Sequence, residues 1–274
     1  MRAGLEAERA LVLGLGGYAV HLAGGTLVVH ERIAVPRFNF VQVEPLSPLR
    51  VAGFFERALD HYFQRAIRPS FRVPLPVPSH VGATLRRLGF RPRPELLSLL
   101  GRATRRTAGT PKRAPLRPGT SADTARLVPF WVSDREGPEL ASALEILRHH
   151  PNPKESVVPV LALEAAAPVA AALVYSPGEE TTLIFGVSTL PGARGRGVAT
   201  SMVRSILQRS PAARTKNVVI FSESARLERR LLAIGFERWA RWRVYDLDPN
   251  SELSLPPTGP RTGPPTWRPP RRSP

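Results

Sequence analysis

Hydrophobic and polar residues alternate along the chain in blocks that predict both strands and helices. In the first hundred residues, period-two alternation and short apolar runs predict strands at residues 18–22, 26–33, 38–43 and 70–76. A helix is predicted for residues 47–66, with Ser47 as N-cap and Pro48 at the first helical position. A second helix, residues 79–88, ends at Gly89. This block is a small unit of mixed helices and strands.

A fuller block of the same kind follows residue 120. Capping residues at 120–123 open a predicted helix to about residue 132, and another helix is predicted at 138–149. Strands are predicted at residues 157–163, 169–175, 181–189, 217–222 and 237–247. Apolar residues at spacings of three and four predict one helix from Val198 and another over residues 225–234.

Two segments lack this alternation and hold much of the positive charge. Residues 102–119 combine arginine, lysine and proline with no acidic residue, and residues 250–274 are rich in proline and arginine. Such compositions bury too little apolar surface to fold, so they predict a basic linker and a disordered tail. The sequence is therefore divided into domains at 1–101 and 120–249, and the net charge of +17 lies largely outside them.

The apolar run at residues 11–29 raises the question of a membrane span. It contains five glycines, and His21 lies at its middle, so a strand hairpin that turns at Gly24 and Gly25 explains it better. Glu6 and Glu8 argue against a signal peptide, whose start is cationic. The chain has no cysteine, which excludes disulfides and thiolate metal sites. We expect a cytoplasmic protein without membrane contact.

The stretch GVSTLPGARGRGVATSMV, residues 186–203, places glycines and two arginines between a predicted strand and a predicted helix. The first amides of a helix have no acceptor within the helix, and the helix dipole makes them partly positive. Glycine lets a bulky anion approach such amides, and Arg194 and Arg196 add cations beside them. The stretch predicts a binding site for a pyrophosphate.

Two other phosphate motifs do not fit. A dinucleotide-binding loop requires Gly-x-Gly-x-x-Gly after a buried parallel strand, and a P-loop requires Gly-Lys-Ser/Thr; the stretch has neither. It does fit Arg/Gln-x-x-Gly-x-Gly/Ala through Arg194, Gly197 and Ala199. The strand before it and the amphipathic helix after it strengthen that match.

These residues resemble a known family. GVSTLPGARGRGVATSMV looks like the acetyl-CoA-binding motif of the GCN5-related N-acetyltransferases (GNAT), including its Pro-x-x-Arg-Gly-x-Gly run from Pro191 to Gly197. SESARLERRLLAIGFERW, residues 222–239, is similar to the second motif, and LRPGTSADTARLVPFW, residues 116–131, resembles the usual opening. The resemblance covers about residues 113–248. It implies an α/β (α+β) fold with a mixed, largely antiparallel sheet flanked by helices.

The resemblance also implies a set of residues that bind acetyl-CoA. The strand before the loop would bind the pantetheine arm through its backbone, and the loop with the start of the next helix would wrap the pyrophosphate. Ser224 stands where the family often has an asparagine that contacts the cofactor. The positions carried over are Val187, Ser188, Thr189, Arg194, Gly195, Arg196, Gly197, Val198, Ala199, Thr200 and Ser224.

The implied chemistry is direct attack of a neutral amine on the acetyl carbonyl in a ternary complex. It requires a base for the amine proton, a donor for the developing oxyanion and an acid for the leaving thiolate. Glu223 is the first candidate for the base, with Glu179, Glu180 or a chain of water molecules as alternatives. The acid is harder to assign, because the family's usual tyrosine position holds Leu231; Tyr245 and Tyr175 are the candidate replacements.

The first half of the chain looks like a degenerate second copy of the same domain. Its last helix and that of the second half both end in Gly-Phe, at Gly89-Phe90 and Gly235-Phe236. Its strand at 38–43 leads into residues 44–47, which contain an acid and no glycine. We therefore expect two related domains in tandem, of which the first binds no CoA and contributes packing.

The sequence thus predicts an acetyl-CoA-dependent N-acetyltransferase. The acceptor would be a small-molecule or peptide amine. No metal is expected, because His149 and His150 point in different directions on a helix and have no third ligand nearby. The alternative is a catalytically weak or inactive GNAT-fold binding module that contacts a partner or nucleic acid through its basic segments. Any nucleic-acid binding would be weak and salt-dependent. The oligomeric state is open between monomer and homodimer.

Overall fold

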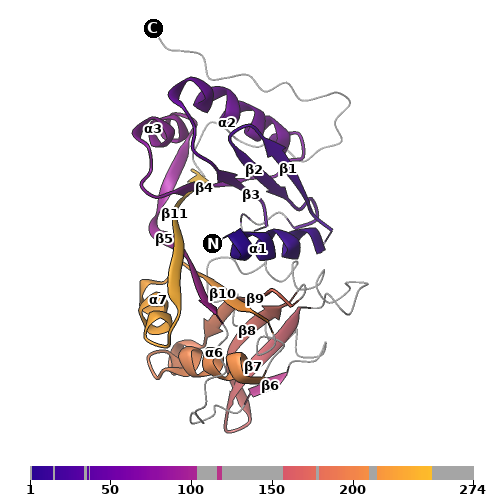
Figure 1. Cartoon of the computed structure of the whole chain (residues 1–274), viewed down its shortest axis with the longest axis vertical. Coiled ribbons are helices and arrows are strands. Elements are labelled where there is room, and N and C mark those ends of the chain that lie inside the picture. The colour runs from indigo at the N-terminus through magenta and orange to yellow at the C-terminus, as the bar shows by residue number, and fades with distance from the viewer. Residues whose placement is uncertain are drawn as a thin grey trace. The chain divides into compact units, whose positions relative to one another are not determined.

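A computed structural model describes residues 2–14, 16–33, 36, 38–103, 116–118, 157–176, 179–209 and 215–248 (Figure 1). The chain divides into two compact units. Unit 1 comprises Met1–Tyr18 and Pro94–Trp242, and unit 2 comprises Ala19–Arg93 and Arg243–Pro274. These units differ from the predicted domains 1–101 and 120–249. The first helix and most of strand β5 belong to unit 1, whereas the end of strand β11 belongs to unit 2.

Unit 1 contains a mixed sheet whose strand order is β11-β5-β10-β9-β8-β7-β6. Its strands are β5 (Phe90–Ala103), β6 (Leu116–Pro118), β7 (Val158–Glu164), β8 (Ala167–Tyr175), β9 (Thr181–Thr189), β10 (Asn217–Ser222) and β11 (Glu237–Leu247). Strands β9 and β10 are parallel, and the pairs β6–β7, β7–β8, β8–β9 and β10–β5 are antiparallel. The predicted bounds of β9, β10 and β11 are confirmed.

Helices cover both faces of the sheet in unit 1. Its helices are α1 (Arg2–Gly14), the single 3₁₀ turn η3 (Pro191–Ala193), α6 (Val198–Arg209) and α7 (Ala225–Leu232). Helix α6 buries Met202, Val203 and Ile206 against the face that carries Ile220. A Cβ at Gly4 of α1 would meet the side chain of Val219 at 3.4 Å. Because neighbouring strand residues point to opposite faces, α1 and α6 lie on opposite sides of β10.

Unit 2 has the strand order β1-β2-β3-β4-β11-β5 with two helices. Its own elements are β1 (Tyr18–Leu22), β2 (Gly25–Val29), β3 (Phe40–Val43), α2 (Pro48–Phe63), β4 (Ser70–Pro74) and α3 (Ser79–Arg87). Strands β3 and β4 are parallel, and β2 and β3 are antiparallel. Phe55, Phe71 and Phe90 form consecutive edge-to-face ring contacts in its core. The hydroxyl of Tyr62 donates to the carbonyl oxygens of Val28 and Phe40 at 2.7 and 2.9 Å.

The predicted hairpin between β1 and β2 is confirmed, with its turn at Gly24, whose φ is +121°. Helix α1 was not predicted from the sequence, because its apolar residues run directly into those of the hairpin. The predicted linker 102–119 also contains regular structure: β6 pairs with β7, and β5 extends to Ala103. Pairing with β7 supplies the backbone partners that proline-rich sequence does not signal.

Several predictions lie outside the described residues. These are the helices at 120–132 and 138–149, the pair His149 and His150, and the tail 250–274. Among the described helices, none has both the length and the apolar content that crossing a bilayer requires.

Candidate acyl-CoA site

The candidate site lies where the two parallel strands of unit 1 separate. Strands β9 and β10 pair only from Thr181 to Ile184 and from Asn217 to Ile220. Beyond these residues β9 continues beside β8, and β10 continues beside β5. The two carboxyl ends therefore have different neighbours and leave space between them. Ligands of open α/β sheets bind at such carboxyl ends.

A β-bulge shapes the end of β9. Across the β8–β9 ladder, Ala171 faces Ser188 and Leu173 faces Phe185, so Gly186 and Val187 together oppose one residue, Ala172. Gly186 has φ +60°, which suits a bulge residue. The bulge changes the direction of β9 just before Val187, Ser188 and Thr189. Bulges are frequent next to active sites.

The glycine-rich loop joins β9 to α6. After the η3 turn, Gly195 and Gly197 adopt φ +86° and +82°, a region that side chains other than glycine rarely enter. The first bond within the helix runs from the Ser201 amide to the Gly197 carbonyl at 2.9 Å. The amides of Val198, Ala199 and Thr200 precede it, so they have no acceptor inside α6. The start of α6 can therefore bind an anion.

The loop, the strand and the two helices line an open cavity of about 380 Å³. It is lined by Val187, Ser188, Thr189, Ala193, Arg194, Gly195, Gly197, Val198, Ala199, Thr200, Ser224, Arg226, Leu227 and Arg230. The structure thus brings together every sequence-predicted cofactor position except Arg196. The volume lies within the range of small-molecule sites, about 300–1,000 Å³.

The two loop arginines have different surroundings. Arg194 lines the cavity, and its Nε donates to the Thr189 carbonyl at 2.9 Å. Arg196 does not line the cavity, because its guanidinium pairs with Glu164 at 2.7 Å. Arg194 is therefore the loop arginine that lines the cavity.

Helix α7 supplies the wall opposite the loop. Ser224 caps it by accepting a hydrogen bond from the Leu227 amide, and Leu227 lies in the cavity wall with Arg226 and Arg230. These two arginines were missed in the sequence. Their signal was available: they are four residues apart and therefore share one helix face.

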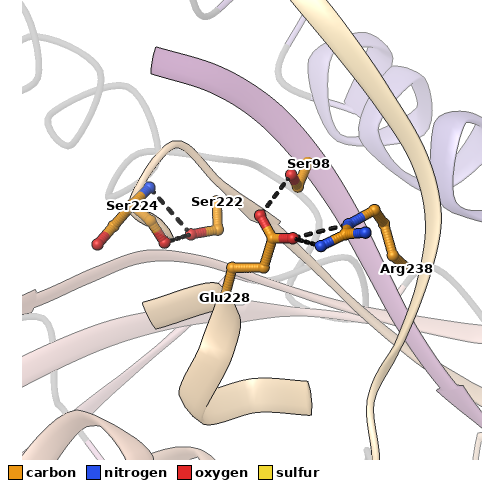
Figure 2. A network of polar contacts seen from close by, with 5 residues as sticks. All are labelled: Ser98, Ser222, Ser224, Glu228 and Arg238. Carbon is orange, nitrogen blue, oxygen red and sulfur yellow. Dashed lines mark hydrogen bonds and ion pairs between the residues drawn. The ribbon is translucent and has the colours of Figure 1, made fainter. Parts of the chain in front are cut away.

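A buried carboxylate fixes α7 to the sheet (Figure 2). Glu228 accepts hydrogen bonds from Ser98 Oγ of β5 and from Arg238 Nε of β11, both at 2.7 Å. Burial raises the pKa of Glu228, but the Ser98 hydroxyl and the Arg238 guanidinium outweigh that effect and hold its pKa below the ordinary value. Glu228 is therefore a charged residue that positions the helix, and it is absent from the cavity wall.

The sequence-predicted catalytic side chains are not gathered at the cavity wall. Tyr175 is buried in β8, and its hydroxyl donates to the Ala10 carbonyl of α1 at 3.2 Å. Tyr245 is buried in unit 2, where its hydroxyl lies 3.2 Å from the position of a Cβ on Gly82. Glu223 is half-buried between β10 and Ser224 and is not part of the wall. Their catalytic roles stay predictions.

The remaining sequence-based predictions for this region concern Leu231 and a metal ion. Leu231, at the family's usual tyrosine position, is fully buried in the core with Phe236, so it packs α7 onto the sheet. In the part of the chain that the structure describes, no three His, Asp or Glu side chains form a group that could hold a metal ion.

A bulged strand, a glycine-rich loop and a helix start thus lie between diverging parallel strands of a mixed sheet. Residues 125–236 match the model of the acetyltransferase (GNAT) family. This part of the chain is therefore similar to that family.

Solved structures agree on the fold. A functionally unknown conserved protein from Staphylococcus epidermidis is 13% identical with a TM-score of 0.67, over 85% of this chain and 95% of that one. A GCN5-related N-acetyltransferase from Kribbella flavida is 15% identical with a TM-score of 0.64, over 91% and 97%. Another from Sphaerobacter thermophilus is 13% identical with a TM-score of 0.59, over 84% and 82%. No curated protein sequence matches the chain.

Proposed function

We propose that the chain is an acetyl-CoA-dependent N-acetyltransferase that acts on a primary amine. The observation that supports this most is the cavity itself, because a bulged strand, a positive-φ glycine loop and helix amides without an acceptor inside the helix line one open cleft. Acetyl-CoA would supply an acetyl group held as a thioester and a pyrophosphate that needs amide and cation donors.

The residues present fit such a ligand. The amides of Val198, Ala199 and Thr200, with Arg194, would bind the pyrophosphate oxygens. Charge-assisted hydrogen bonds of this kind contribute about 1.5–3 kcal/mol each. The backbone of Val187, Ser188 and Thr189 would hold the pantetheine arm. The amide of Val187, at the bulge, is the proposed donor to the acetyl oxygen as negative charge develops there.

The transfer balances without a further reactant. The amine nitrogen forms a bond to the acetyl carbon, the carbon–sulfur bond breaks, the amine loses one proton and the thiolate takes up one. Glu223, directly or through water, is the proposed acceptor of the amine proton. Ser224 follows it at the cavity wall and carries a hydroxyl.

The test is release of free thiol from acetyl-CoA by the whole chain. The acceptors would be a panel of small amines, amino-acid derivatives, aminoglycosides and peptides with a free N-terminus. The chain has no cysteine, so the protein adds no thiol background. Thiol release that depends on an amine and is absent in Gly197→Asp supports the proposal. Tight CoA binding with no release for any amine would favour a binding module instead, and no CoA binding would overturn both.

A further inference from the structure

Three arginines line the cavity, and two of them come from helix α7. Arg226 and Arg230 are four residues apart, so both point along the same face of α7. Within the described residues, neither takes part in a hydrogen bond or an ion pair. Arg196 and Arg238, by contrast, are paired with Glu164 and Glu228. The α7 wall therefore carries positive charge that no neighbouring carboxylate compensates.

This charge lies beside the loop but extends beyond it. A Cβ at Gly195 would be 3.4 Å from Arg226 Nη2, so Arg226 reaches the edge of the glycine loop. Arg230 lies one turn further along α7, about 6 Å away in helix rise. The loop amides and Arg194 lie together at the start of α6. The arginine pair of α7 adds donors that suit a second anionic group.

We propose that Arg226 and Arg230 bind the 3′-phosphate on the ribose of CoA and so make the site select CoA over 3′-dephospho-CoA. The inference rests on the proposed function, since it assumes that the pyrophosphate occupies the loop. A phosphate monoester is the part of CoA that 3′-dephospho-CoA lacks, and it carries up to two negative charges. Two guanidinium groups on one helix face match its two negative charges and can donate hydrogen bonds to its three terminal oxygens.

The test compares the affinities of CoA and 3′-dephospho-CoA for the whole chain by titration calorimetry. We expect the wild-type protein to bind CoA about tenfold or more tightly than 3′-dephospho-CoA, since each charge-assisted contact changes affinity by about that factor. In Arg226→Gln/Arg230→Gln the affinity for CoA should fall to that for 3′-dephospho-CoA. The affinity for 3′-dephospho-CoA itself should stay within about twofold of wild type.

The matched control is Arg204→Gln/Arg229→Gln. It removes two exposed arginines from α6 and α7, and neither lines the cavity. The control should keep the preference for CoA. The inference is overturned if wild type binds both ligands equally, if the double variant loses affinity for both alike, or if the control loses the preference equally. Failure of wild type to bind either ligand would instead count against the proposed function.

Discussion

Unit 1 and unit 2 each contain a pair of parallel strands with the same elements around it. In unit 1 the order is β9, α6, β10, α7, β11, and in unit 2 it is β3, α2, β4, α3, β5. The last helix of each series ends at a glycine with positive φ, Gly235 at +90° and Gly89 at +79°. The shared order supports descent of both halves from one domain, which stays a prediction.

The two regions differ in the segment between the first parallel strand and the next helix. Unit 1 has Leu190–Gly197, with its glycines, before α6, whereas unit 2 has only residues 44–47 before α2. In that short segment Leu46 is buried, and its side chain packs beside Gly24. His80 of α3 bonds the Leu46 carbonyl through Nε2 at 2.9 Å. The segment is thus a short turn that Leu46 and His80 fix to the core of unit 2.

The second residue of α3 and the second residue of α7 show the contrast between the two units most directly. His80 and Arg226 are each the second residue of the helix that comes after the second parallel strand. His80 bonds to the backbone of the turn before α2, while Arg226 lies in the wall of a cavity. The order of elements alone does not make an anion site. The length and glycine content of one loop decide whether helix amides stay accessible.

The largest effect should come from Gly197→Asp. Residue 197 has φ +82°, and an aspartate there would be strained and would place a carboxylate among the phosphate-binding amides. We expect CoA affinity to fall by about 100-fold or more, which titration calorimetry would measure.

Gly16→Asp is the matched control for backbone strain. Gly16 also has positive φ, at +92°, and its would-be Cβ meets nothing within 4 Å. The two variants should lose similar stability, about 1–2 kcal/mol, but only Gly197→Asp should lose CoA binding. Equal loss of binding in both variants would show that strain, and not the loop, controls the affinity.

The sequence predicted the loop of unit 1 but not the wall opposite it. Strands β9 and β10 have the predicted bounds because each is built around a short apolar run. Strand β11 mixes apolar and charged residues, and its bounds follow from Gly235 before it and Pro249 after it. The phosphate loop was predicted because its glycines and arginines lie between a predicted strand and a predicted amphipathic helix. In α7, however, several charged residues lie side by side, and composition does not tell which of them face a cavity.

The other features that the sequence did not predict depend on contacts between segments far apart in the chain. Glu228 was not singled out, because its partners Ser98 and Arg238 come from β5 and β11, far apart in sequence. The exchange of strand segments between the units was also not predicted, since the hydrophobic pattern is the same whichever sheet a strand joins. The Gly186 bulge did have a signal, since glycine inside a strand often marks one.

An intermediate effect is expected for Glu228→Gln, which tests whether α7 of unit 1 depends on its buried carboxylate. The α3 residue at the corresponding place before Gly-Phe is Gly82. The substitution weakens the hydrogen bonds from Ser98 and Arg238. We expect the free energy of unfolding to fall by about 2 kcal/mol, since solvent screens part of the interaction with Arg238, which is 42% exposed. Urea unfolding at pH 7 would measure it.

The pH dependence sharpens this prediction. The pKa of Glu228 is lower in the folded chain than in the unfolded chain, so its stabilisation is complete above about pH 4.3 and is lost as pH falls through the folded-state pKa. The difference between wild type and Glu228→Gln should therefore shrink below about pH 4. Glu237→Gln, an exposed carboxylate of β11, should show no such difference. If the stability difference between wild type and Glu228→Gln does not vary with pH, Glu228 is not charged in the folded chain.

The smallest effect is expected in unit 2. His80→Leu removes the bond to the Leu46 carbonyl and should lower the free energy of unfolding by about 1 kcal/mol, while His80→Gln can still donate and should recover part of it. Both variants should bind CoA like wild type, because the turn of unit 2 at residues 44–47 has no glycine and carries the acidic Glu44 where a phosphate would lie. A change in CoA affinity with either variant would mean that this turn contributes to ligand binding. The functional contrast between the two parallel pairs would then fail, even though their loops differ.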